Sequence, residues 1–104
     1  MSVLSITFHT PAPLLEAWET YVNNELHQMA ENLMDVEKYV LSEVYSEMIN
    51  EGKNTNLLLI FENDEKREDF LGIEMQNITE RIENQFGHEV MVFQTLLNPI
   101  KTRF

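Results

Sequence analysis

The chain has 104 residues and no Cys, and it carries 18 Asp and Glu against seven Lys and Arg, a formal net charge of −11. This length suits one domain with a hydrophobic core, so we expect a single domain over residues 1–104. The negative charge disfavours nucleic acids and anionic membranes as partners, and the lack of Cys excludes disulfides and thiolate chemistry.

The first predicted element is a strand over Val3 to His9, where side chains alternate between two faces. One face is fully apolar and consists of Leu4, Ile6 and Phe8. The other face is mixed and carries Ser5, Thr7 and His9. The segment has neither the basic start nor the apolar run of a signal peptide, so we expect a cytoplasmic protein.

The second predicted element is one amphipathic helix that ends near Asp35. Two Pro residues in Thr10-Pro11-Ala12-Pro13 end the strand and favour a helix start. Apolar residues then recur every three or four positions, at Leu14, Trp18, Val22, Leu26, Met29 and Leu33. His27 lies beside this stripe, with Glu31 one turn later.

Two further strands are predicted in the middle of the chain. Val36 to Met48 alternates and is rich in β-branched and aromatic residues, which indicates a strand beginning near Glu37. A turn signal at residues 50–54 joins it as a hairpin to residues 57–61, which belong to the longest apolar run. Leu58 and Ile60 must lie on one side of this central strand and Leu57, Leu59 and Phe61 on the other. The pattern leaves open which set faces the helices.

A second helix and a last strand complete the pattern. Asn63 or Asp64 is placed to cap the helix at its start, and Gly87 to end it. The apolar stripe of this helix consists of Leu71, Met75, Ile78, Ile82 and Phe86. Phe70, Gly72 and Ile73 fit the stripe less well, which indicates either a bend or an apolar surface covered by a second subunit. Val90 to Leu97 alternates as the final strand, and Pro99 ends it.

The order β-α-β-β-α-β predicts a ferredoxin-like α+β fold. Each β-α-β crossover is right-handed, so both helices should cover the same face of a four-stranded antiparallel sheet. The first and third strands lie in the centre. The opposite sheet face would remain apolar and uncovered, and we therefore predict a homodimer in which two such faces pack together.

Polar residues on the first strand suggest a small-molecule site at that interface. Ser5, Thr7 and His9 would bring polar groups into a cavity with apolar walls. Tyr39 and Gln94 could contribute if their faces coincide with the cavity, and His27 is a further candidate. The alternative is that these side chains are ordinary rim and surface residues.

The sequence contains no recognisable motif for a metal or a cofactor. Its three His residues, His9, His27 and His88, are too dispersed to form a metal motif, and no phosphate-binding glycine pattern occurs. We therefore expect neither a metal nor a cofactor.

Residues 3–8 (VLSITF), Trp18 and Tyr21 ahead of His27, and residues 86–95 (FGHEVMVFQT) resemble a bacterial family known as a domain of unknown function. This family is similar to the dimeric α+β barrel superfamily, which implies that fold and a dimer. The superfamily includes cofactor-free monooxygenases, haem-degrading enzymes and non-catalytic proteins.

Two functions follow from this resemblance. One is a non-catalytic dimer with a small-molecule binding or structural role. The other is a cofactor-independent monooxygenase-like enzyme that acts on an apolar or aromatic molecule in the sheet-face cavity. In that enzyme His9, His27 or Tyr39 would polarise or deprotonate the ligand.

Overall fold

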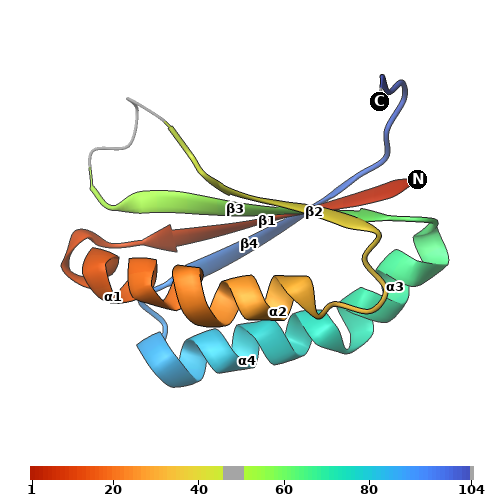
Figure 1. Cartoon of the computed structure of the whole chain (residues 1–104). Helices are drawn as coiled ribbons and strands as arrows, with labels where there is room; N and C mark the ends of the chain where they lie inside the picture. Colours follow the sequence, from red (N-terminus) through yellow and green to blue (C-terminus); the bar gives the residue numbers. More distant parts are fainter. Residues whose placement is uncertain (46–50, 104) are drawn as a thin grey trace.

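The computed structural model describes residues 1–45 and 51–103 and confirms the predicted ferredoxin-like fold (Figure 1). The strands are β1 (Ser2–Thr10), β2 (Lys38–Glu43), β3 (Lys53–Phe61) and β4 (Met91–Leu97). They form one antiparallel sheet in the order β2-β3-β1-β4, with β1 and β3 in the centre as predicted. The helices cover one face of this sheet and lie below it in Figure 1. Among the described residues, no helix is long and apolar enough to span a bilayer.

The strand register decides which side of the central strand meets the helices. Leu4 pairs with Leu59 and Ile6 pairs with Leu57, and all four side chains are fully buried in the core between the sheet and the helices. Phe61 continues this set. Leu58 and Ile60 therefore point to the opposite face, which the helices leave uncovered.

The first predicted helix consists of several segments, and these change its buried stripe. They are η1 (Ala12–Leu14), α1 (Leu15–Tyr21), η2 (Val22–Leu26) and α2 (His27–Glu31), of which η2 is a π-helical turn. Trp18 and Leu26 are buried as predicted, whereas the other stripe residues are only partly buried. Tyr21 and Ala30 are buried instead. Tyr21 follows Trp18 by three positions in α1 and so shares its face, whereas Ala30 is buried because the wider π-helical turn shifts the helical phase of the residues after it.

The second predicted helix is divided at Ile73. Its parts are α3 (Asp64–Gly72) and α4 (Glu74–Phe86), and the backbone at Ile73 has φ −127° and ψ −66°. Asn63 caps α3, since its side-chain oxygen accepts a hydrogen bond from the Lys66 amide over 2.9 Å. Phe70 is fully buried and Ile73 is 67% exposed. The predicted bend is thus confirmed, and Ile73 does not belong to the core.

The hairpin between β2 and β3 differs from the predicted one. β2 ends at Glu43, and residues 46–48 of the predicted strand lie outside the described residues. Lys53 and Asn54, predicted as turn residues, belong to β3 because they pair with Thr10 and His9 of β1. Pairing with a strand remote in sequence therefore extends β3 into the turn signal.

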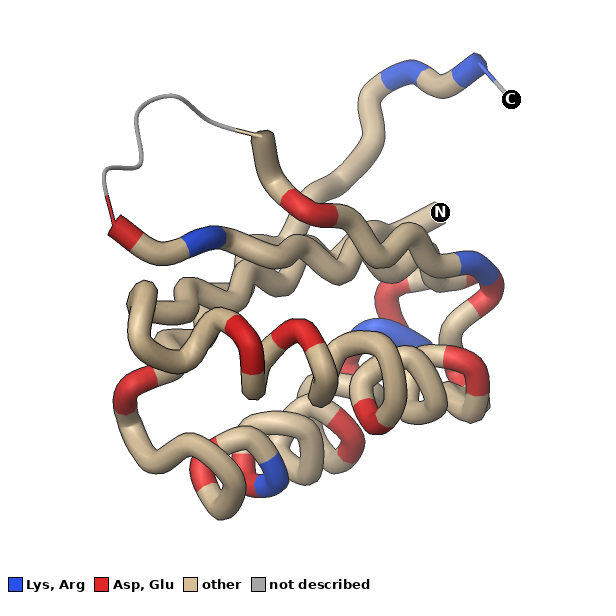
Figure 2. The backbone as a smooth tube through the Cα atoms, turned by 60° about the vertical axis from the view of Figure 1, so that its left-hand side comes forward, with Lys and Arg blue, Asp and Glu red and all other residues tan. Residues whose placement is uncertain are grey.

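Charged residues are distributed unevenly over the two sides of the molecule. Figure 2 shows that Asp and Glu lie mainly along the helices and loops, while most of the sheet carries neither sign. β1 and β4 contain no charged residue. The sheet face away from the helices is therefore the least charged part of this acidic protein.

Candidate functional site

The sheet surface opposite the helices, which we call the open face, carries the first candidate site. The pairing register gives its members: Val3, Ser5, Thr7 and His9 of β1; Lys38, Val40 and Ser42 of β2; Asn54, Asn56, Leu58 and Ile60 of β3; and Met91, Phe93, Thr95 and Leu97 of β4. Val40 and Phe93 are 50% and 53% exposed, and Met91 and Leu97 are also exposed. The open face thus carries seven apolar side chains among its fifteen members, and no other element within the described residues covers it.

A polar cluster lies in the middle of the open face. Asn56 donates hydrogen bonds from its side-chain nitrogen to Ser5 Oγ over 2.8 Å and to Thr7 Oγ1 over 3.2 Å, and it also approaches the Ile6 carbonyl at 3.3 Å. A hydroxyl that accepts a hydrogen bond still has its own proton to donate. Ser5 and Thr7 can therefore each donate to a group above the sheet.

His9 lies near the end of β1, the strand that carries Ser5 and Thr7, and Asn54 orients its ring. Its Nδ1 is 2.7 Å from the side-chain oxygen of Asn54. An amide oxygen can only accept, so Nδ1 carries the proton, and Nε2 of the neutral ring keeps a free lone pair. This arrangement makes Nε2 available as a hydrogen-bond acceptor or a base.

His27 and Tyr39 lie away from the open face, around Glu31. Tyr39 pairs with Leu59 and so points to the helix side, where its hydroxyl donates a hydrogen bond to Glu31 Oε1. That hydrogen bond is the main cause of the raised pKa of Tyr39. His27 Nε2 is 3.6 Å from the same carboxylate oxygen, on an exposed helix surface. Tyr39 could join Ser5 and Thr7 only if it shared their sheet face, and the strand pairing places it on the other face.

Gln94 is also separated from the open face. It pairs with Ile6, a residue of the helix side, and it lines a shallow surface depression beside Met75 and Thr79 of α4. Alternation along β4 therefore turns Gln94 toward the helices. Of the six predicted site residues, the structure brings together Ser5, Thr7 and His9.

A groove of about 430 Å³ lies between the π-helical turn and the β2–β3 edge, where Trp18 and Thr55 meet. π-helical turns occur often at functional sites. Lys53 lines this groove, and its Nζ is 2.8 Å from a Glu43 oxygen and 3.6 Å from a Glu19 oxygen. The hydrogen bond that the Lys53 ammonium donates to Glu43 is the main cause of the raised pKa of Lys53. The charged groups of this groove thus satisfy one another.

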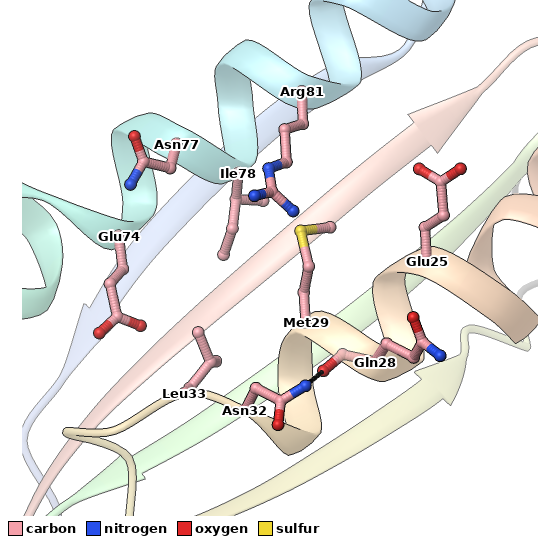
Figure 3. Close-up of a pocket in the computed structure, with 9 residues that line it drawn as sticks. All are labelled: Glu25, Gln28, Met29, Asn32, Leu33, Glu74, Asn77, Ile78 and Arg81. Carbon is pink, nitrogen blue, oxygen red and sulfur yellow. Dashed lines mark hydrogen bonds between the residues drawn. The ribbon is translucent and has the colours of Figure 1, made fainter.

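A second groove, of about 460 Å³, separates η2 and α2 from α4, and we call it the interhelical groove (Figure 3). Its lining residues are Glu25, Gln28, Met29, Asn32, Leu33, Glu74, Asn77, Ile78 and Arg81. Figure 3 shows Arg81 reaching from α4 toward the α2 side, with Glu25 at the same end of the groove and Glu74 at the other end. Burial, followed by the charge of Asp35, raises the pKa of Glu74.

The fold defines the chain as a ferredoxin-like α+β protein of the kind that includes dimeric members. It matches a protein of Deinococcus radiodurans provisionally assigned as an antibiotic biosynthesis monooxygenase, with TM-score 0.71, 12% identity, and 100% and 97% of the two chains covered. A dimeric ferredoxin-like protein from an uncultured marine organism matches with TM-score 0.68, 9% identity and 100% and 99% coverage. SnoaB, a cofactor-independent oxygenase from Streptomyces nogalater, matches with TM-score 0.60, 8% identity and 97% and 95% coverage.

The chain belongs to the family of the domain of unknown function DUF4286, whose sequence profile matches residues 1–100. This result confirms the resemblance to a family of unknown function. The comparison with curated proteins gave no match. The structural similarities, at these low identities, show the fold alone.

Sequence reasoning missed Asn54 and Asn56, which complete the polar cluster. Both precede the Leu run at positions that alternate with it, in phase with Leu58 and Ile60. Extending the strand period backward through the turn signal would have placed them on one face. It also missed the interhelical groove, because a groove between two helices depends on how they pack.

Proposed function

We propose that the protein is a homodimer in which the open faces of two copies pack together. The observation that supports this proposal is the open face itself, where Val40, Phe93 and Leu97 are roughly half exposed in a single chain. Large apolar side chains exposed on one surface often mark an interface. Two sheets packed face to face would bury these side chains without any further element.

The charges favour a second copy of this chain as the occupant. The chain as a whole carries a net charge of −11, so two copies repel each other at most surfaces. The open face contains no Asp or Glu, and its only formal charge is Lys38. Two such faces can therefore approach without carboxylates opposing one another.

The polar cluster gives the dimer a binding role. Ser5, Thr7, His9, Asn54 and Asn56 would meet the partner sheet beside the apolar side chains of the open face. A small apolar molecule with one polar group fits such a site, because Ser5 and Thr7 can donate hydrogen bonds and His9 Nε2 can accept one. The function is thus non-catalytic binding of a small molecule by a dimer, and the absence of Cys is compatible with the cytoplasm.

The dimer is tested by introducing a charge into the open face. Phe93→Asp should convert the wild-type dimer into a monomer in sedimentation velocity at micromolar concentration, because a carboxylate would be buried in the interface. Ile73→Asp is the matched control, since Ile73 is exposed outside the open face and should leave the dimer intact. A monomeric wild-type protein would refute the proposal.

A cofactor-independent monooxygenase-like enzyme is the second candidate, and the free Nε2 of His9 favours it. In this reaction His9 would take a proton from an acidic carbon or hydroxyl of an aromatic substrate. One atom of O₂ would enter the substrate, and the other would leave as water with two substrate hydrogens. The electrons would therefore come from the substrate. The oxygenase SnoaB, which shares the fold, is described as needing no cofactor.

Oxygen uptake distinguishes the enzyme from the binding protein. Anthrones and hydroquinones are suitable probes because they can supply the electrons themselves. An enzyme should consume O₂ above the protein-free rate and lose this activity in His9→Gln but not in His88→Gln, where an exposed His is replaced. Binding of the probes without oxygen uptake would leave the non-catalytic function standing and exclude this enzyme activity.

A further inference from the structure

Arg81 differs from the other basic residues of the folded body. Lys53 and Lys66 have carboxylate partners, and Arg67 is buried with hydrogen bonds to the Val3 and Leu97 carbonyls. Within residues 1–45 and 51–103, the guanidinium of Arg81 forms no hydrogen bond or ion pair. This is unexpected in a chain with 18 acidic residues, and it leaves a guanidinium free at the interhelical groove.

The sequence of α4 keeps acidic side chains away from Arg81. Residues three and four positions away on a helix lie on the same face, and at Arg81 these are Asn77, Ile78, Asn84 and Gln85. α4 carries Glu74, Glu80 and Glu83, but none occupies those positions. The guanidinium is therefore unpaired along its own helix and turned toward α2, as Figure 3 shows.

A buried hydroxyl without a partner lies near the same end of the groove. Tyr21 is 5% exposed, and its hydroxyl oxygen has no hydrogen-bond partner among the described residues. Burial raises the pKa of Tyr21, Glu25 raises it further and Arg81 lowers it, so the hydroxyl is within reach of both charges. A carboxylate and a guanidinium thus line one end of the interhelical groove, and a buried hydroxyl lies behind its lining within reach of both charges.

The lining of the groove indicates the chemistry of its ligand. Met29, Leu33 and Ile78 provide an apolar floor between the two helices. Glu25 and Glu74 outnumber Arg81, so a plain carboxylate would be repelled and a plain amine would leave the guanidinium unpaired. A molecule that carries one positive charge, one negative charge and an apolar group can pair with Glu25 and Arg81 and cover the apolar floor. The volume of about 460 Å³ lies in the range of small-molecule sites.

We propose that the interhelical groove binds an α-amino acid with an apolar side chain. The ligand carboxylate pairs with Arg81, where guanidinium and carboxylate can form two parallel hydrogen bonds. The ligand ammonium pairs with Glu25, and the apolar side chain lies on Met29 and Ile78. This site is on the helix side of the sheet and remains open when the open faces pack in a dimer.

The proposal is tested by titrating the full-length ¹⁵N-labelled protein with L-leucine, L-methionine and L-phenylalanine and following its amide resonances. We expect saturable shifts for residues of the groove, including Met29, Ile78 and Arg81. N-acetyl-L-leucine lacks the ammonium and L-leucinamide lacks the carboxylate. Each should bind about tenfold more weakly than L-leucine, or weaker still, because a charged group is left unpaired.

Three variants test whether Arg81 and Glu25 pair with the two charged groups of the ligand. Arg81→Gln and Glu25→Gln should each weaken L-leucine binding by about tenfold or more. Glu80→Gln is the control, since it removes a charge from α4 outside the groove and should leave the affinity unchanged. The proposal is overturned if none of the three amino acids gives saturable shifts, if L-leucine and its two analogues bind equally, or if Arg81→Gln binds like the wild type.

Discussion

Trp18 donates the proton of its indole nitrogen to Thr55 Oγ1 over 3.0 Å, and both side chains are buried. This hydrogen bond joins the first helix to β3 at the start of an aromatic cluster in which Trp18 contacts Phe8, Tyr21 and Phe86. It is therefore a tertiary contact that holds the helix layer in position over the sheet.

Thr55→Val tests this contact, because valine has nearly the same shape but cannot accept a hydrogen bond. The buried indole N–H would lose its partner, which should lower the free energy of unfolding by about 1–2 kcal/mol. Thermal unfolding should then show a melting temperature lower by about 5–15 °C. Thr79→Val, which removes a hydrogen bond within α4 to the Met75 carbonyl, should cost less. Equal losses in the two variants would contradict a special role for Thr55.

Gly52 is required by a close approach between the chain before β3 and the end of β1. Its φ is +78°, and a Cβ there would lie 2.1 Å from the Thr10 carbonyl oxygen. Gly52→Ala should therefore destabilise the protein by at least about 2 kcal/mol in urea unfolding. Gly72→Ala in α3 is the contrasting variant, because no atom lies within 4 Å of its Cβ position and its φ is not positive. Gly72→Ala should raise the free energy of unfolding by about 0.4–1 kcal/mol. If it instead lowers the free energy of unfolding as much as Gly52→Ala does, the close approach at Gly52 does not explain the effect there.

Glu74 predicts a pH dependence of stability. Burial raises its pKa in the folded protein above the unfolded value, so folding favours the protonated form. The stabilisation from this group is complete below the unfolded pKa and is lost as the pH rises through the folded pKa. At neutral pH the charged Glu74 therefore disfavours folding, and Glu74→Gln should be more stable than the wild type.

The measurement is urea unfolding of Glu74→Gln and wild type at neutral pH and at a pH below the ordinary pKa of glutamate. The difference should be present at neutral pH and disappear in acid. Glu80→Gln corrects for the general gain from removing one negative charge in a chain of net charge −11. A gain no larger than that of Glu80→Gln would show that the position of Glu74 is irrelevant.

The open-face residues show how much of the candidate site a sequence can predict. Alternation along β1 placed Ser5, Thr7 and His9 on one face, and the structure confirms this because strand geometry turns successive side chains to opposite sides. The same pattern could not place Tyr39 and Gln94. Which face each of them joins depends on the pairing of β2 with β3 and of β4 with β1, strands that lie far apart in sequence.

In the helices, too, some buried residues can be predicted from the sequence and others cannot. The spacing of Met75, Ile78 and Ile82 predicted their burial, since it follows from the helical period alone. Ala30 is part of the core because the π-helical turn shifts the helical phase before it, and a regular period does not reveal this shift. The groove that contains Glu25 and Arg81 exists only because η2 and α2 lie beside α4.

The sequence by itself determined the order of the elements, the two faces of each strand and the ferredoxin-like topology, because these depend on neighbours along the chain and on the handedness of crossovers. Only the tertiary structure decided that Leu57, Leu59 and Phe61 meet the helices while Leu58 and Ile60 lie on the open face with Asn56. Both sets are apolar and suit a core equally well. The choice between them is made by strand pairing and helix packing, which bring together residues up to some ninety positions apart.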